Sequence, residues 1–135
     1  MLKYLLDTNI VIHVIKRRPP AVREVFNRQH GRMAISAITL AELVHGAEKS
    51  QFSARNLDVV EDFFSRLTVL PYIPEAAYHY GGIRAELERQ GKPIGVNDLH
   101  IAAHARSVGL TLVTNNLAEF ERVPGLLVEN WLAER

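Results

Sequence analysis

The chain has 135 residues, 47% of them hydrophobic, and this length and composition predict one globular domain over 1–135 with its own core. The absence of cysteine excludes disulfide frameworks, thiolate zinc sites and cysteine nucleophiles. Sixteen Lys and Arg residues nearly balance 15 Asp and Glu residues, so the net charge of +1 does not by itself indicate a nucleic-acid-binding protein. No apolar run is long enough to cross a membrane, and we expect a soluble, cytoplasmic protein without membrane association.

Short apolar segments alternate with segments of helical periodicity along the whole chain. In chain order, we expect strands at 3–6, 33–36, 68–70, 110–114 and, at the sheet edge, 126–130. The intervening helices are expected at 8–17, about 20–29, 37–49, 54–66, 74–90 and 97–107. Strands that alternate with helices predict an α/β fold, in which a mostly parallel sheet of four or five strands is covered by helices on both faces.

Three acidic residues stand among apolar neighbours, close to the ends of strands or the beginnings of helices. Asp7 directly follows the first strand in YLLDTNIVI, and Glu42 is the lone carboxylate in SAITLAELV. Asp98 lies at the start of a helix, beside Asn97, which is itself a good helix-capping residue. Helix capping or contact with solvent would also explain each of them. Because the carboxyl ends of parallel strands meet at one edge, we expect the three to gather there, with Glu119 of VTNNLAEF as the candidate fourth acid.

Carboxylates gathered at one edge would repel one another, and a divalent cation would relieve that repulsion. Oxygen ligands without cysteine select Mg²⁺ or Mn²⁺ over zinc. His100 and His104 have a spacing that could bind zinc, but they lie far around the helix from Asp98 and no third ligand is evident, so we do not expect a zinc site.

At this point the sequence resembles a known family, the PIN-domain ribonucleases, and within it the VapC-type toxins of bacterial toxin–antitoxin pairs. The matching segments are LLDTNIVI at 5–12, ISAITLAEL at 35–43, GAEKS at 46–50, IGVNDLHIAAHA at 94–105 and LVTNNLAEFERVPGL at 112–126. The resemblance implies a three-layer α/β/α domain with an acidic metal pocket that cleaves RNA. Position by position, Asp7, Glu42 and Asp98 match the acidic triad of the family.

The fourth acidic position departs from the family pattern. Many relatives resemble V-T-x-D-x-x-D-F in this region, whereas this chain has Asn116 at the first acidic position and Glu119 at the second. We therefore expect Glu119 to be the fourth acid and Asn116 to be a polar neighbour. The residues expected to line the pocket are Thr8, Asn9, Thr114, Asn115 and Asn116.

The resulting hypothesis is metal-assisted hydrolysis of an RNA phosphodiester. Asp7, Asp98 and Glu42 would hold Mg²⁺ or Mn²⁺, and Glu42 with Glu119 would orient or deprotonate the attacking water. Contacts to RNA phosphates are assigned to four basic residues, which solvated helix ends would also explain: Lys16, Arg17, Arg18 and Arg84. The resemblance further implies a structured RNA such as tRNA as substrate, a VapB-type antitoxin that plugs the acidic pocket, and a homodimer.

Two other interpretations remain. A phosphatase with an aspartate nucleophile would also place Asp7 after a strand, but it requires a second aspartate two residues later, where this chain has Asn9. A domain that only binds a protein partner could carry the same acids, and it would show neither metal-dependent cleavage nor metal binding.

Overall fold

The structure is a computed structural model that describes residues 1–16 and 20–132. Its strands are β1 (Tyr4–Leu6), β2 (Met33–Ser36), β3 (Thr68–Leu70), β4 (Thr111–Val113) and β5 (Val128–Glu129). Its helices are α1 (Thr8–Lys16), α2 (Pro20–Arg28), α3 (Ala37–Glu48), α4 (Ser53–Phe64), α5 (Pro74–Arg89), α6 (Val96–Val108) and α7 (Leu117–Phe120). All the expected strands and helices are present within a few residues of their expected bounds, and α7 is an additional short helix. Among the described helices, none has the length and apolar character needed to span a lipid bilayer.

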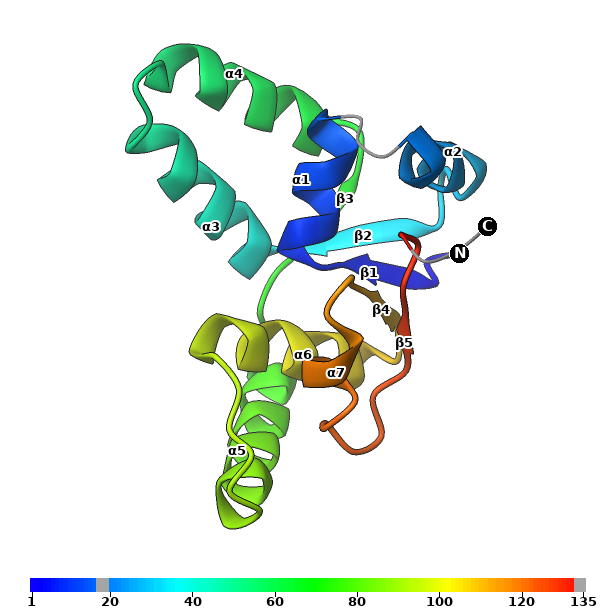
Figure 1. The fold of residues 1–135 in the computed structure, drawn as a ribbon, viewed down its shortest axis with the longest axis vertical. Helices are drawn as coiled ribbons and strands as arrows, with labels where there is room; N and C mark the ends of the chain where they lie inside the picture. The colour runs from blue at the N-terminus through cyan, green and yellow to red at the C-terminus, as the bar shows by residue number, and fades with distance from the viewer. Residues whose placement is uncertain (17–19, 133–135) are drawn as a thin grey trace.

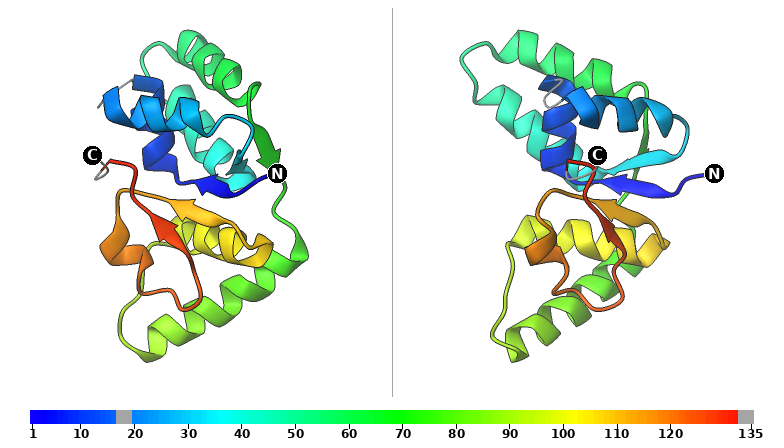
Figure 2. Two further views of the ribbon diagram at one scale, coloured as in Figure 1. Left: turned by 90° about the vertical axis from the view of Figure 1, so that its right-hand side faces the viewer. Right: turned by 45° about the vertical axis from the view of Figure 1, so that its right-hand side comes forward.

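The five strands form one sheet in the order β3-β2-β1-β4-β5, and every pair of neighbours is parallel. Helices α1 to α4 lie on one side of this sheet and α5 to α7 on the other (Figure 1; Figure 2). The predicted three-layer α/β/α fold is therefore confirmed, including the position of β5 at an edge. Because all strands run the same way, their carboxyl ends lie along a single edge of the sheet.

Burial on both faces explains why the inner strands consist almost entirely of apolar residues. All residues of β1, β2 and β4 are buried, as expected for parallel strands covered by helices. Successive side chains alternate between the layers: Leu6 and Ile35 pack with the α1 side, whereas Leu5, Ala34 and Leu112 pack with the α6 side. Each fully buried leucine contributes about 1.5–3 kcal/mol relative to an exposed one, so β1 is firmly fixed at the centre.

Helix α6 begins and ends at glycines rather than at polar capping side chains. Gly95 is its N-cap residue and no side chain caps this end, so neither Asn97 nor Asp98 has the capping role considered from sequence. At the other end, Gly109 has a φ of +72°, a left-handed conformation that glycine adopts without steric cost, and its N–H donates to Ala105 and Arg106 carbonyls. The polar residues of the first turn are thus free to point elsewhere.

His104 of α6 is fully buried and contacts the start of α3. Its Nδ1 lies 2.8 Å from Oγ of Ser36, and the same oxygen accepts the N–H of Ile38 and caps α3. His100 instead lies 2.8 Å from the hydroxyl of Tyr72, so the two histidines use separate hydrogen-bond partners, although both rings pack edge-on against Tyr72. Burial lowers the pKa of His104 because the imidazolium ion is poorly solvated in the interior.

The pH dependence of stability should reflect His104. A histidine in the unfolded chain has a pKa of about 6.5, so below about pH 7 the unfolded state binds more protons than the folded state, and the free energy of unfolding falls. His104→Gln, which cannot be protonated, should remove this part of the fall, at most about 1.4 kcal/mol per pH unit. Urea unfolding between about pH 7 and pH 5 measures the difference. His30→Gln, which removes an exposed histidine, is the control. If the free energy of unfolding falls with pH by the same amount in H104Q as in the unchanged protein, the prediction is wrong.

Candidate active site

Four carboxylates meet at the carboxyl edge of the sheet, each carried by a different segment. Asp7 directly follows β1, Glu42 lies in α3, Asp98 in the first turn of α6, and Glu119 in α7. Their negative charges act on one another: those of Glu42 and Glu119 raise the pKa of Asp7, and those of Glu119, Asp7 and Glu42 raise that of Asp98. The structure thus brings together the acids singled out from sequence, while their catalytic roles stay predictions.

Asp7 is the most deeply placed of the four, with only 3% of its surface exposed. Its Oδ1 accepts the N–H of Thr8 at 2.7 Å and its Oδ2 accepts the hydroxyl of Thr114 at 2.8 Å. The Thr114 oxygen in turn accepts the N–H of Asn116 at 3.0 Å. Burial raises the pKa of Asp7, while the Thr114 and Thr8 hydrogen bonds act in the opposite direction. Two donors therefore hold this carboxylate in one orientation.

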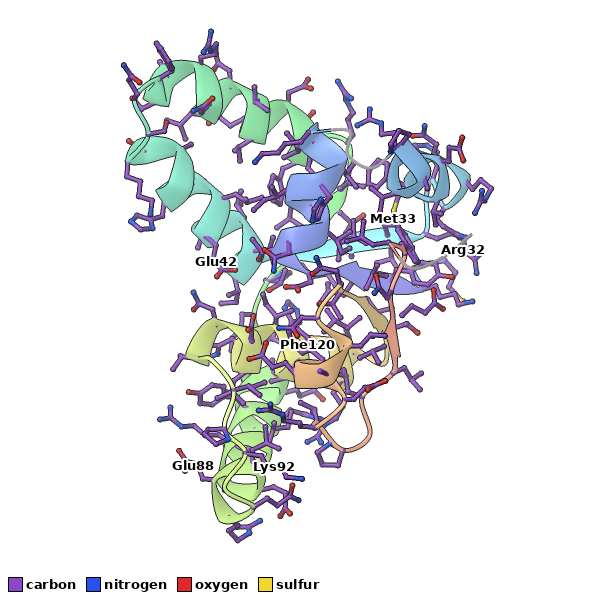
Figure 3. The ribbon with its side chains drawn as sticks, in the orientation of Figure 1. Arg32, Met33, Glu42, Glu88, Lys92 and Phe120 are labelled. Carbon is purple, nitrogen blue, oxygen red and sulfur yellow. The ribbon has the colours of Figure 1, made fainter. Side chains whose placement is uncertain are left out.

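Glu42 is half-buried and is held by neutral donors from two other elements. The hydroxyl of Thr8 donates to its Oε1, and the amide of Asn97 donates to its Oε2 at 2.9 Å. Thr8 also lies 3.2 Å from the hydroxyl of Thr39, on the same helix as Glu42. Figure 3 shows Glu42 on the end of α3 that lies nearest α6. These contacts join α1, α3 and α6 at a single carboxylate.

Asp98 and Glu119 form the other half of the cluster and share a hydrogen bond. Glu119 also accepts the side-chain amide of Asn116 at 2.6 Å and the N–H of Gly95 at 3.3 Å. Burial, followed by the hydrogen bond and charge of Glu119, raises the pKa of Asp98 to about 7. The Asp98 carboxyl group therefore keeps its proton to a higher pH than an exposed aspartate does.

No Lys or Arg among residues 1–16 and 20–132 forms an ion pair with any of the four acids. An unneutralised set of carboxylates, hydroxyls and amides has the donor chemistry that suits a hard divalent cation such as Mg²⁺ or Mn²⁺. In the described part of the chain, however, no three acidic or histidine side chains approach closely enough to hold one ion. The donors fit the cation by chemistry, and ligation would require some of them to exchange their present hydrogen bonds.

The remaining residues predicted for the site are spread more widely. Asn9 and Asn115 are exposed next to Thr8 and Thr114, and Lys16 is exposed at the end of α1. Arg17 and Arg18 lie outside the described residues. Arg84 lies on α5, where it donates to Glu88 at 3.0 Å and to the hydroxyl of Tyr80 at 2.7 Å, not to an acid of the cluster.

Sequence reasoning missed the contact that Asn97 makes with Glu42. It considered Asn97 only as a helix cap, because Asn before an apolar helix is a common capping residue. Asn116, expected to be only a polar neighbour, holds both Glu119 through its side chain and Thr114 through its backbone. The pairing of each asparagine with a particular acid has no signature in local sequence spacing.

Comparisons with known proteins identify the family of this chain. The sequence profile of the PIN domain matches residues 4–126. A protein named ribonuclease VapC2 from Haemophilus influenzae is 63% identical over 132 residues, which cover 98% of this chain and 100% of that protein. A tRNA(fMet)-specific endonuclease VapC from Shigella flexneri is 60% identical over 131 residues, covering 97% of this chain and 99% of the relative.

A solved structure shares both the fold and the sequence. The crystal structure of DNA-bound VapBC from Salmonella typhimurium contains a chain that superposes with a TM-score of 0.93 at 58% identity, covering 97% of this chain and 99% of the other. Similarity of this extent spans every element that carries one of the four acids. The chain therefore belongs to the PIN-domain family and, within it, to the VapC proteins.

Proposed function

We propose that this chain is a metal-dependent endoribonuclease toxin that hydrolyses phosphodiester bonds in structured RNA, with tRNA as the substrate. The observation that carries the proposal is the cluster of four carboxylates, held by hydroxyls, amides and backbone N–H groups and without a cationic partner in the described residues. The names of the Haemophilus and Shigella relatives, a ribonuclease and a tRNA(fMet)-specific endonuclease, support the same activity and substrate.

The side chains divide into those that would hold the metal ion and those that would move a proton. Asp7, fixed by Thr8 and Thr114, and Asp98 would hold Mg²⁺ or Mn²⁺ together with Glu42. When bound, this ion lowers the pKa of a water molecule and neutralises charge on the scissile phosphate. Glu42, oriented by its two donors and assisted by Glu119, would accept the proton of the attacking water. Asp98 must lose its own proton before it can act as a ligand.

Removing the carboxylate of Asp7 or of Asp98 should abolish most cleavage while the fold persists. Asp7→Asn and Asp98→Asn should each reduce kcat/KM on tRNA by a factor on the order of 100 or more, because the ion and the attacking water lose their anchor. The assay measures RNA cleavage with Mg²⁺ or Mn²⁺ and with chelator, and sequencing should find 5′-phosphate product ends. Asp58→Asn, an exposed acid on α4, is the matched control.

If D7N cleaves RNA almost as fast as the unchanged protein, the role assigned to Asp7 is wrong. Cleavage that continues in excess chelator would contradict metal dependence. A chain that neither cleaves RNA nor binds either ion would favour a domain that only binds a protein partner, whereas hydrolysis of phosphate monoesters alone would favour the aspartate-nucleophile phosphatase.

The raised pKa of Asp98 predicts a pH-dependent cost to stability in ion-free protein. An aspartate in the unfolded chain has a pKa of about 3.9, whereas that of Asp98 is about 7 in the folded protein. The folded state then binds more protons, so the free energy of unfolding decreases as pH rises from about 4 to about 7. Above that range Asp98→Asn should be more stable than the unchanged protein by about 1 kcal/mol, a value discounted for the solvent exposure of Asp98.

Urea unfolding in chelator at about pH 8 and about pH 4 tests this, and the advantage of D98N should disappear at the lower pH. Asp58→Asn again serves as the control, since its carboxylate lies outside the cluster. Adding Mg²⁺ or Mn²⁺ should stabilise the unchanged protein more than D98N. If D98N is less stable than the unchanged protein at about pH 8, the conclusion that ionised Asp98 destabilises the folded state is wrong.

We further infer that a VapB-type antitoxin inhibits this chain and lays an apolar segment in a groove between α1, α3 and α4. The groove has a volume of about 320 Å³, and its apolar lining includes Ile12, Ile15, Leu43, Ala47 and Val59. It is bordered by the two helices that carry Thr8 and Glu42, so a segment bound there could continue to the acids. The VapBC complex among the similar structures supports such a partner; the homodimer implied by the resemblance stays a prediction for α3 and α5.

Placing a charge in this groove should weaken inhibition without affecting cleavage. Val59 is 44% exposed, so Val59→Lys should fold normally yet weaken binding of the product of the neighbouring gene by about tenfold, through the lost apolar contact. Copurification and rescue of growth by the co-expressed partner measure this. Val108→Lys, at a similarly exposed position on α6, is the control. Equal inhibition of the two variants would place the antitoxin elsewhere.

A further inference from the structure

Three polar side chains outside the four acids are completely buried where α6 meets the end of β2 and the first turn of α3. They are His104, Ser36 and Thr39, each with 0% of its surface exposed. Figure 1 shows α3 beginning at the end of β2, next to α6. A buried polar group costs stability unless it forms hydrogen bonds, so the partners of these three side chains indicate why they are polar.

His104 contacts Ser36, and Ser36 holds the beginning of α3. Nδ1 of His104 lies 2.8 Å from Oγ of Ser36, and this oxygen accepts the N–H of Ile38 at 3.0 Å. The Ser36 hydroxyl has one proton to donate, and among the described residues the imidazole nitrogen is the acceptor that it reaches. Burial lowers the pKa of His104, so the ring is neutral at about pH 7 and Nδ1 can accept that proton.

The second ring nitrogen of His104 has no such partner. In the described part of the chain, its Nε2 is the one buried side-chain nitrogen or oxygen that forms no hydrogen bond. The neighbouring buried positions of α6 are apolar, among them Ile101 and Ala105. A leucine at position 104 would avoid the cost of an unpaired nitrogen. The hydrogen bond with Ser36 is what distinguishes this histidine from an apolar residue.

The buried hydroxyl of Thr39 leads to Glu42. The hydroxyl oxygens of Thr39 and Thr8 lie 3.2 Å apart, and Thr8 donates its proton to Oε1 of Glu42. Because a hydroxyl has a single proton, Thr39 is the donor toward Thr8. Successive hydrogen bonds that end on a carboxylate polarise and strengthen one another. The orientation of Glu42 therefore depends on the position of Thr39.

The first turn of α3 connects the two sets of contacts. Ser36 is the N-cap residue of this helix, and Thr39 is the third residue after it. A side-chain cap holds the N–H groups of the first turn, and this turn frays more easily when the cap is weakened. A displaced Thr39 would lengthen its contact with Thr8 and leave Glu42 less well oriented.

We propose that His104 is a positioning residue that orients Glu42 through Ser36 and the first turn of α3. It acts through other side chains and not by contact with the substrate. The inference rests on the proposed ribonuclease function and adds to it a residue from the middle of α6. The orientation of Glu42 affects proton transfer from the attacking water more than it affects RNA binding. We therefore expect His104 to change kcat and to leave KM almost unchanged.

Cleavage kinetics on tRNA at saturating Mg²⁺ or Mn²⁺ test this role. His104→Leu should lower kcat by about tenfold and change KM by less than about twofold. His104→Asn, whose amide oxygen can accept the Ser36 proton, should retain at least about a third of kcat. Thermal unfolding establishes that the assay temperature lies below the unfolding transition of every variant.

His79→Leu is the matched control, because His79 also joins α6 to another helix through Nδ1, which accepts Nε of Arg106 at 2.9 Å. It removes a comparable contact on a different side of α6, so H79L should keep kcat within about twofold of the unchanged protein. A loss of kcat in H79L equal to that in H104L would overturn the positioning role, as would an unchanged kcat in H104L.

Thr39→Val tests the other end of the same connection and carries the test if H104L does not fold. It removes the hydroxyl with little change of volume, and kcat should again fall by about tenfold. The double variant H104L/T39V should lose little more than the weaker of the two single variants, because both changes disturb the same contact with Thr8. An unchanged kcat in T39V, or fully multiplicative losses, would overturn the inference.

A spectroscopic measurement in chelator separates this inference from the function on which it rests. In protein labelled at its threonine methyl groups, H104L should shift the resonances of Thr39 and Thr8, and H79L should shift neither. The methyl group of Thr68, on β3, is the internal reference. If these shifts occur in a chain that cleaves no RNA, the connection to Glu42 is supported and the ribonuclease proposal is overturned. If the unchanged protein cleaves RNA and H104L leaves the Thr8 resonance in place, the ribonuclease stands and the positioning role is overturned.

Discussion

The mutual repulsion of four carboxylates at one edge of the sheet is the constraint on which the rest of the structure depends. Asp7 is almost completely buried, and among the described residues no Lys or Arg forms an ion pair with it. Burying an ionised carboxylate is costly unless hydrogen bonds compensate for the lost water. Thr8 and Thr114 supply those bonds for Asp7, while Asp98 responds differently and retains a proton up to about pH 7. The site therefore opposes folding, as functional sites often do.

The parallel sheet supplies the stability that this arrangement requires. β1 lies at the centre, between β2 and β4, and all three strands are buried on both faces. Asp7 therefore follows the most constrained strand, and its N–H is bonded to the Val113 carbonyl at 2.9 Å. Glu119 lies instead on the four-residue α7, where its partners are an asparagine amide and a backbone N–H. One acid thus follows the central strand, and the other lies on a short helix that the fully buried Phe120 anchors in the core.

The strands and the longer helices could be predicted because burial leaves apolar runs and periodic patterns in the sequence. The expected strands 33–36 and 68–70 coincide with β2 and β3, since each is a short apolar run with clear boundaries. α7 could not be predicted in the same way, because four residues are too few to display helical periodicity. Capping was considered for Asp98 and Asn97 because the rule is local, but Gly95 begins α6 and leaves both side chains to distant partners.

The sequence by itself determined the order in which parallel strands and helices follow one another along the chain. It thereby also determined the edge of the sheet at which the four acids gather, because the carboxyl ends of parallel strands lie at one edge. Only the tertiary structure decided how each acid is held. Thr8 and Glu42 are 34 residues apart, and Asn97 and Glu42 are 55 apart. Such contacts depend on how α1, α3 and α6 pack against one another, and side-chain packing between distant segments leaves no periodic signal along the chain.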